Sequence, residues 1–339
     1  MKIHKICTFI LILIPVFTIF IGCQKEKKEA KITKITCSSI APPDATHSKG
    51  LKKFKEVVEL ESKGQIKVTL YFAGQIFTQE GELAACREGT LDMAFFSAGW
   101  LAEWVPYLSM IGAVYTFSGY DHMTKVLNGE IGKEIFDEVV EKVGVRPLSA
   151  FYLGTRQLNV VKKVGPIRHP DQMKGVKLRT PSSPTWIALG KALGANPTPM
   201  SFGEVYIGLK TGVIEGQDNP LSADRDAKFY EVTKYIILTD HMADSVWPTI
   251  NEKKWQSLSK KEQKIIIDAL EVAREYQDKL VLEEEKSIRE FFEKEGIIFV
   301  DDPDKDAFQK YAANSYKTES KEISKNWDWD LYDRIQLLK

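Results

Sequence analysis

The feature that most constrains the fold is a regular alternation of β-forming and helix-forming segments near the start of the chain. Strands are expected at 31–39, 66–72 and 91–96, with helices at 47–62 and 79–87 between them. The order β-α-β-α-β is typical of a parallel sheet whose connecting helices cover its faces. We therefore expect an α/β protein.

The alternation continues along the chain. A long amphipathic helix is expected at 121–143, because its apolar residues keep helical spacing and Gly144 supplies a stop signal. Strands are also expected at 146–153, 157–161, 176–179, 235–238 and 246–250, and helices at 183–193 and 201–210.

One helical stretch is unusually long. From Ser259, which forms a capping-box pattern with Glu262, the chain has no Gly or Pro up to Lys294. At 1.5 Å per residue this helix would be about 50 Å long, more than the width of one small domain. We expect it to cross two lobes. A solvated coiled-coil arm is the alternative, but the apolar spacing holds no strict heptad.

The C-terminal part contains a short expected strand at 296–300 and a further helix. An aromatic-rich tail follows at 327–332, and we expect Trp327 and Trp329 to pack it against a lobe.

The first 22 residues have the pattern of an export signal. Lys2 and Lys5 precede an apolar run at 6–21. With Pro15 at its centre, this run is shorter than the roughly 20 apolar residues that a membrane-spanning anchor needs. We expect a cleaved signal peptide at 1–22.

The end of that run resembles the lipobox of bacterial lipoproteins, in which the cysteine becomes the lipidated first residue. The sequence is Phe20-Ile21-Gly22-Cys23, and Phe20 departs from the usual Leu. Residues 23–30 are polar and suit a tether. We expect a periplasmic or cell-envelope protein anchored through lipidated Cys23. An ordinary secreted protein with a chance cysteine is the alternative.

Charge and motifs exclude several functional classes. The chain has 339 residues, with 47 basic and 47 acidic side chains, so nothing favours a nucleic-acid partner. No G-x-G-x-x-G, G-x-S-x-G or P-loop motif occurs, and the five His have no metal-site spacing. We expect no cofactor, no metal and no enzyme activity. Cys37 and Cys86 are expected to be small buried residues.

Two arginines are expected beside strand ends. Arg156 lies between two strands, and Arg179 closes the strand at 176–179. Ligands of doubly wound α/β domains bind outside the carboxyl ends of strands. A guanidinium presents a planar fork that matches a carboxylate. By position alone, either arginine could equally be a solvated or salt-bridged surface residue.

The stretch 173–230 closely resembles the solute-binding subunits of TRAP (tripartite ATP-independent periplasmic) transporters. The motifs that carry this resemblance are KGVKLR at 174–179, GANPTPM at 194–200, FGEVY at 202–206 and GQDNP at 216–220, together with GTLDM at 89–93 and GTRQ at 154–157.

The resemblance implies a two-lobed periplasmic-binding-protein fold, with a ligand cleft between the lobes and a long helix spanning both. It also implies that Arg179 is the main clamp for a ligand carboxylate, that Arg156 assists it, and that Phe202 and Asn219 line the pocket. Without it, Phe202 would be read as a core residue and Asn219 as a turn residue. Asp218 is taken as structural, because an acid would oppose a carboxylate ligand.

We expect lobe I to comprise 31–153 and 245–284, and lobe II to comprise 154–244 and 285–339. The protein would be a monomer that captures an organic acid and delivers it to the integral membrane subunits of the transporter. A binding protein that serves a sensor, or an extracytoplasmic enzyme on the same fold, is the alternative.

The ligand's body is expected to meet aromatic side chains. Sialic-acid-binding relatives have Glu in place of Phe96 and Arg in place of Gly99, and both polar groups are absent here. Trp100 and Trp186 lie nearby in the expected fold. We therefore predict a monocarboxylate with an apolar or aromatic body. The alternatives are that Phe96 and Trp100 belong to the core, or that the ligand is a C4-dicarboxylate whose second carboxylate binds Arg156.

Overall fold

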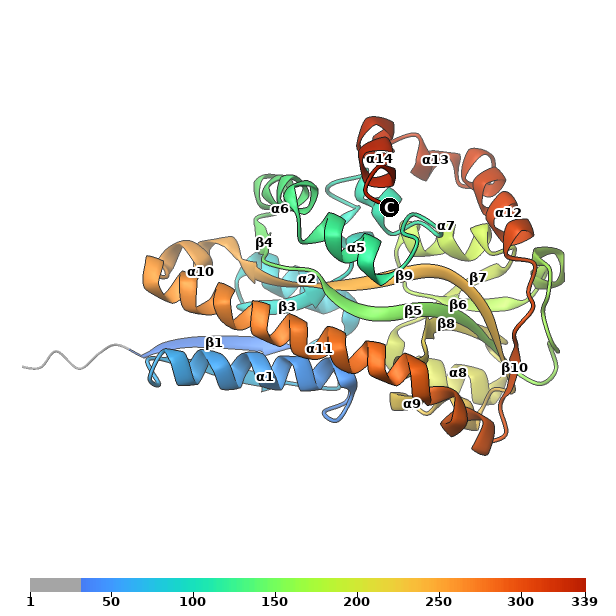
Figure 1. Cartoon of the computed structure of the whole chain (residues 1–339), viewed down its shortest axis with the longest axis horizontal. Coiled ribbons are helices and arrows are strands. Elements are labelled where there is room, and N and C mark those ends of the chain that lie inside the picture. The colour runs from blue at the N-terminus through green and yellow to red at the C-terminus, as the bar shows by residue number, and fades with distance from the viewer. Residues whose placement is uncertain (1–31) are drawn as a thin grey trace, which may run out of the picture. The chain divides into compact units, whose positions relative to one another are not determined.

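The computed structural model describes residues 32–339, which form one compact unit (Figure 1). The predicted signal peptide at 1–22, the lipidation of Cys23 and the tether at 23–30 lie outside the described residues. Within 32–339, ten strands form one mixed sheet in the order β2-β1-β3-β9-β5-β8-β6-β7, with β4 and β10 paired to β9. The prediction of an α/β protein is confirmed.

The N-terminal elements follow the predicted alternation. Strands β1 (Thr33–Ser38), β2 (Ile66–Tyr71) and β3 (Met93–Phe96) are parallel, and β1 lies between the other two. Helices α1 (Thr46–Glu61) and α2 (Gln79–Glu88) connect them. Helix α1 buries Leu51, Phe54 and Val58, whose spacing puts them on one face.

The second half of the sheet repeats this arrangement. Strand β6 (Lys177–Thr180) is parallel to both β7 (Asn196–Pro199) and β8 (Gly216–Pro220). Three helices accompany these strands: α7 (Pro184–Ala192), α8 (Val205–Thr211) and α9 (Leu221–Asp226). The β-α-β order again places the ends of parallel strands at one edge of the sheet.

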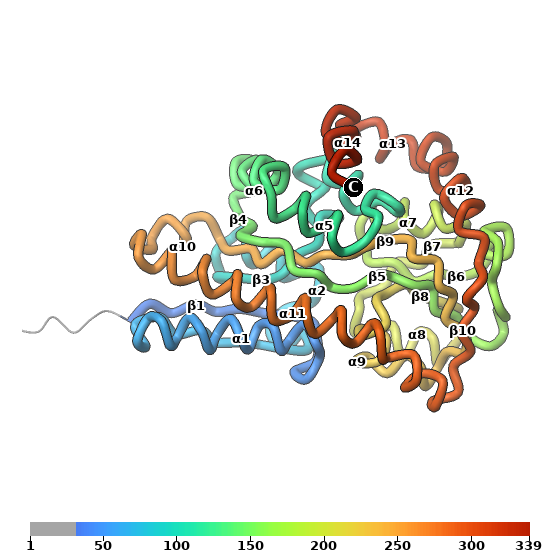
Figure 2. The backbone as a smooth tube through the Cα atoms, viewed as in Figure 1, coloured from blue at the N-terminus to red at the C-terminus, as the bar shows by residue number. Residues whose placement is uncertain are grey.

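Two long antiparallel strands join the halves (Figure 2). Strand β5 (Phe151–Val160) and the 17-residue β9 (Tyr235–Asn251) were each predicted as separate short strands, and that prediction was wrong. Register shifts absorb the interruptions in the apolar pattern, and one of them lies beside Gly154. Short strands β4 (Val145–Pro147) and β10 (Ile298–Val300) pair with the two ends of β9.

The single helix expected at 121–143 is two helices, α5 (Tyr120–Leu127) and α6 (Glu130–Val143). Gly129 lies between the two helices, and a Cβ atom there would lie 2.5 Å from the carbonyl oxygen of Lys125. The backbone therefore follows a path at the break that leaves no room for a side chain.

The long helix is confirmed as α11 (Lys260–Lys294), 35 residues that begin with the predicted Ser259–Glu262 capping box. It packs against α1 in one half of the fold and against α9 in the other, as Figure 1 shows. It therefore ties both lobes to one rigid element. Within residues 32–339, no helix is apolar enough over sufficient length to cross a membrane.

The C-terminal segment contacts both halves. Helix α12 (Lys305–Lys317) packs with α7, whereas Leu331 of α14 (Trp329–Gln336) joins the core of the first half. Trp327 packs against the core of the first half and against the core of the second half. Its Nε1 donates a hydrogen bond to Ser109 Oγ at 3.1 Å. The packing predicted for the aromatic tail is confirmed for Trp327.

The remaining short helices are α3 (Ala98–Leu101), α4 (Leu108–Ile111), α10 (Glu252–Ser257) and α13 (Lys321–Ser324).

The lobe boundaries stay a prediction. One observation bears on them, because α14 packs with the core of the first lobe although 285–339 was assigned to the second.

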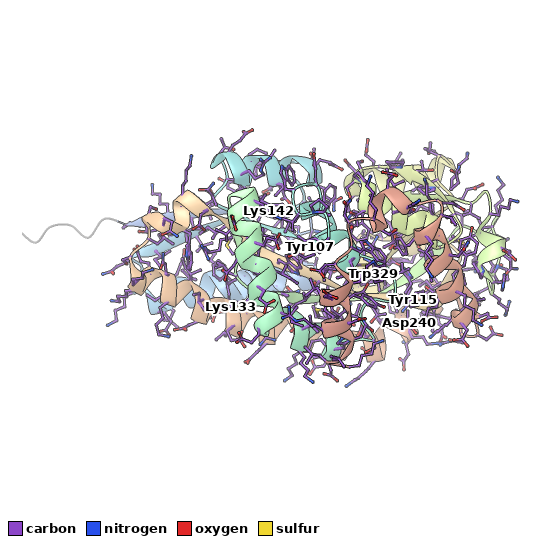
Figure 3. The ribbon with its side chains drawn as sticks, turned by 90° about the horizontal axis from the view of Figure 1, so that it is seen from above. Tyr107, Tyr115, Lys133, Lys142, Asp240 and Trp329 are labelled. Carbon is purple, nitrogen blue, oxygen red and sulfur yellow. The ribbon has the colours of Figure 1, made fainter. Side chains whose placement is uncertain are left out.

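In Figure 3, Trp329 of this helix and Tyr115 lie on the same side of the molecule, and both line a groove beside α12.

Candidate functional site: a cavity at the strand ends

A cavity of about 120 Å³ lies at the carboxyl ends of β1, β3, β6 and β8. This is the position at which α/β folds bind ligands, since the loops after parallel strands meet there. Its walls combine charged, hydroxyl and aromatic side chains: Ser39, Thr46, His47, Gln79, Glu82, Phe95, Ser97, Trp100, Arg156, Arg179, Trp186, Phe202, Asn219, Ser222, Asp226 and Asp244.

Arg179 lies near the end of β6, as the sequence predicted, and is only 2% exposed. Its Nε donates to the Met200 carbonyl at 2.9 Å, and Nη2 donates to Gln79 Oε1 at 3.3 Å. The guanidinium lies 5.8 Å from the centre of the Phe202 ring. Among residues 32–339 no carboxylate forms a salt bridge with it. Burial lowers the pKa of Arg179 to about 10.

Arg156 is in a different electrostatic state. It is 6% exposed, and its Nε donates to Asp244 Oδ2 at 2.8 Å. Its Nη1 donates to the carbonyl of Asp218 at 2.8 Å and to the carboxylate of the same residue at 3.2 Å. Burial alone would lower the pKa of Arg156, but the two carboxylates raise it. The protein itself already neutralises this cation.

The acids around Arg156 form a buried network. Burial raises the pKa of Asp244 above its ordinary value. Burial also acts on Asp218, but Arg156 and His241 hold the pKa of that carboxyl below its ordinary value. His241 Nε2 lies 3.3 Å from Asp218 Oδ2. The structural role predicted for Asp218 fits this pairing. Asp244 was not predicted, because no local pattern links it to an arginine 88 residues earlier.

The other predicted aromatic and amide residues also reach the cavity. Phe202, Asn219, Trp100 and Trp186 all line it. Trp186 stacks on Arg156, whose guanidinium lies 4.5 Å from the ring. Asn219 accepts a hydrogen bond from Arg156 Nη1 at 3.3 Å and donates to Gln217.

Phe96 is the exception, and its prediction as a site residue needs correction. It is buried in the core of the first lobe, opposite Trp247 of β9. Its neighbour Phe95 lines the cavity and packs edge-on against His47, with ring centres 5.0 Å apart. Successive side chains of a strand point to opposite faces, so only one of the two Phe residues can face the ligand space.

Several polar residues of the first lobe were not predicted. His47 and Gln79 stand at the starts of α1 and α2. Burial lowers the pKa of His47 to about 4, so its ring is neutral at pH 7. It lies 3.0 Å from Gln277 of α11. The strand-end rule applied to the β1–α1 loop would have indicated His47.

The two lobes contact each other on both sides of the cavity. On one side, Ser201 Oγ donates to Glu80 Oε2 of α2 at 2.8 Å. On the other, the backbone N–H of Thr46 donates to Asp226 Oδ2 of α9 at 3.1 Å. The cavity is therefore enclosed by side chains from both halves of the sheet.

Cys37 and Cys86 are buried, as predicted, and burial raises the pKa of both thiols. Neither forms a disulfide within residues 32–339. Within residues 32–339, no group of three or more His, Cys, Asp or Glu side chains could hold a metal ion.

Comparison with known proteins gives the family. The model of the bacterial extracellular solute-binding protein family 7 matches residues 37–322. The chain belongs to this family. A solute-binding protein of Roseobacter denitrificans is 35% identical over 263 residues, 78% of this chain and 79% of the relative. The sialic acid-binding periplasmic protein of Vibrio cholerae is 32% identical over 266 residues, 78% of this chain and 82% of the relative.

Solved family 7 structures share the fold. A TRAP periplasmic solute-binding protein of Roseobacter denitrificans, solved with 3-deoxy-D-manno-oct-2-ulosonic acid, has a TM-score of 0.85 and 32% identity, covering 91% of this chain and all of that one. Another, from Chromohalobacter salexigens with D-glucuronate, has a TM-score of 0.83 and 28% identity, covering 90% of this chain and all of that one.

The family membership identifies the chain as a transport solute-binding protein with the two-lobed fold, and not as an enzyme. TRAP solute-binding proteins are periplasmic. The predictions of the family, the fold class and the transport role are confirmed.

Proposed function

We propose that this protein captures a hydroxylated organic acid by its carboxylate on Arg179 and delivers it to the integral membrane subunits of a TRAP transporter. The observation that carries the proposal is a guanidinium that is 2% exposed, lines the cavity and forms no salt bridge within residues 32–339. A buried cation without a counter-ion is costly. A ligand carboxylate would supply that counter-ion.

In this proposal the two arginines have different roles in binding the ligand. Arg179 offers its unneutralised fork to the ligand, while Gln79 and Met200 hold the guanidinium in place. Arg156 is already paired with Asp218 and Asp244 and holds the wall of the site in place. Its positive charge assists binding by attracting the ligand carboxylate from a distance. This pairing disfavours a dicarboxylate, because a second ligand carboxylate would compete with both acids for Arg156.

The predicted apolar or aromatic body of the ligand rested on Phe96, Trp100 and Trp186. Phe96 belongs to the core, and one face of Trp186 is occupied by Arg156. The remaining walls include hydroxyl, amide and carboxyl groups from both lobes. The solved relatives hold acids such as D-glucuronate, and that is a property of those proteins. The polar groups support a monocarboxylate with several hydroxyl groups, although Trp100, Leu153 and Val246 add apolar surface to the same cavity.

Calorimetry on purified protein tests the clamp. A thermal-shift screen of organic acids comes first, since a ligand that binds only the folded state raises the melting temperature. Arg179→Lys should then weaken binding by about 2 kcal/mol or more, because the ammonium keeps the charge and loses the fork. The matched control is Arg168→Lys, at an exposed arginine paired with Asp302. Unchanged affinity in Arg179→Lys would refute the clamp.

Delivery and location need separate tests. Uptake of the labelled ligand into vesicles that contain the two membrane subunits should require this protein. A protein that served a sensor would give no uptake.

If Cys23 is lipidated, a radiolabelled fatty acid should enter the wild type and not Cys23→Ser, which would become soluble. Unlabelled, soluble wild type would instead indicate a freely diffusing periplasmic protein.

A further inference from the structure

Glu82 is a buried acid in the cavity wall with one oxygen left without a protein partner. It lies on α2 and is 3% exposed. Its Oε1 accepts a hydrogen bond from Ser38 Oγ at 2.7 Å. No hydrogen bond to Oε2 exists within residues 32–339, although the side chain lines the cavity. Oε2 is not among the fully buried polar atoms that lack a partner, so it keeps some accessible surface while the residue lines the cavity, where a ligand group could reach it.

Its position relative to Arg179 follows from the helix. Gln79, which touches the Arg179 guanidinium, is three residues before Glu82 on α2. Side chains three apart lie on one helix face with Cβ atoms about 5 to 6 Å apart. A ligand whose carboxylate binds Arg179 beside Gln79 could therefore extend along the helix face that carries Glu82.

We propose that Glu82 is a specificity-determining residue that binds a hydroxyl group in the middle of the ligand and so selects polyhydroxylated acids over unsubstituted ones. The inference rests on the carboxylate clamp of the proposed function. An acid without that hydroxyl leaves Oε2 unpaired in the closed site, and sites built around a buried polar group reject such analogues strongly.

The protonation of Glu82 supports this role. Burial raises its pKa to about 7, against the hydrogen bond from Ser38. Below that pH the carboxyl is neutral, can donate as well as accept, and does not repel the ligand carboxylate. The titratable and charged groups around it are Cys37 of β1, Cys86 of α2 and Asp92 before β3, and the cavity also holds His47, Arg156, Arg179, Asp226 and Asp244.

The test measures affinity by calorimetry for L-galactonate, D-glucuronate and hexanoate, at pH 6 and pH 8. Glu82→Met should weaken binding of both sugar acids at least tenfold and should not weaken binding of hexanoate, because it removes the carboxyl that hexanoate leaves unpaired. Wild type should bind D-glucuronate at least threefold more tightly at pH 6 than at pH 8. Glu82→Gln, which keeps the shape and cannot ionise, should lose this pH dependence. Glu88→Gln, on the exposed side of the same helix, is the control.

Three outcomes would overturn the inference. Equal losses for hexanoate and the sugar acids in Glu82→Met would show a merely structural role. A wild type that prefers hexanoate would exclude hydroxyl recognition and leave the Arg179 clamp standing, whereas a wild type that binds no carboxylate would refute both. If Glu82→Met does not fold, Glu82→Gln decides, and an unchanged pH dependence in that variant would contradict the proposal.

Discussion

At the scale of single residues, the site separates two arginines that look alike in the sequence. Arg179 faces the cavity as a buried cation, and Arg156 is held by acids from β8 and β9. Both lie beside strand ends, so position alone does not distinguish them. The difference arises from residues that approach from other parts of the chain.

Replacing Arg156 tests that distinction. In Arg156→Ala, Asp218 and Asp244 would be left buried without their cation. Breaking a buried ion pair from one side costs about 3 to 5 kcal/mol, so we expect a large loss in the free energy of unfolding, measured by urea denaturation. Arg179→Ala should cost the unliganded protein much less, because no acid within residues 32–339 forms a salt bridge with Arg179. Equal stability of Arg156→Ala and wild type would contradict the network.

At the scale of elements, β5 depends on one glycine where it passes between the lobes. Gly154 has φ +123°, and a Cβ atom there would lie 2.7 Å from Cβ of Pro220 in β8. The position is therefore restricted both by the backbone and by the neighbouring strand. A register shift in the pairing of β5 with β9 lies beside the same glycine.

Gly154→Ala should lower the free energy of unfolding by about 3 kcal/mol or more, since strained backbone and overlap both contribute. Gly165→Ala is a matched control, because Gly165 has φ +83° and no atom lies within 4 Å of its added Cβ. It should cost about 1 kcal/mol, from backbone strain alone. Chemical denaturation measures both, and equal losses would show that contact with Pro220 is unimportant.

At the scale of the whole molecule, binding depends on contact between the lobes. The hydrogen bond from Ser201 to Glu80 joins the segment before α8 in one lobe to α2 in the other. A ligand that binds between the lobes gains from every contact that favours their approach.

Ser201→Ala should therefore weaken ligand binding about fivefold, the equivalent of about 1 kcal/mol for one hydrogen bond, while the melting temperature of the free protein changes little. Ser257→Ala is the control, since the Ser257 hydroxyl is exposed and bonds only within its own turn. Calorimetry gives the affinities, and small-angle scattering the lobe separation. A variant with wild-type affinity would show that this contact does not contribute to closure.

Features that depend on neighbouring residues could be predicted from the sequence. The parallel β-α-β order, the 35-residue α11 with its Ser259–Glu262 cap, and the position of Arg179 at the end of β6 were all predictable. Periodicity and capping act over a few residues, so one segment contains all the information they need.

The remaining features depend on how distant segments pack in the folded chain. The tertiary structure joined two expected strands into β9, turned Phe95 and not Phe96 toward the cavity, and paired Arg156 with Asp244 from 88 residues away. It also placed Glu82 beside the ligand space. Strand pairing and the burial of charge depend on which distant segments come into contact. In this chain those contacts determine which charged groups of the site are paired.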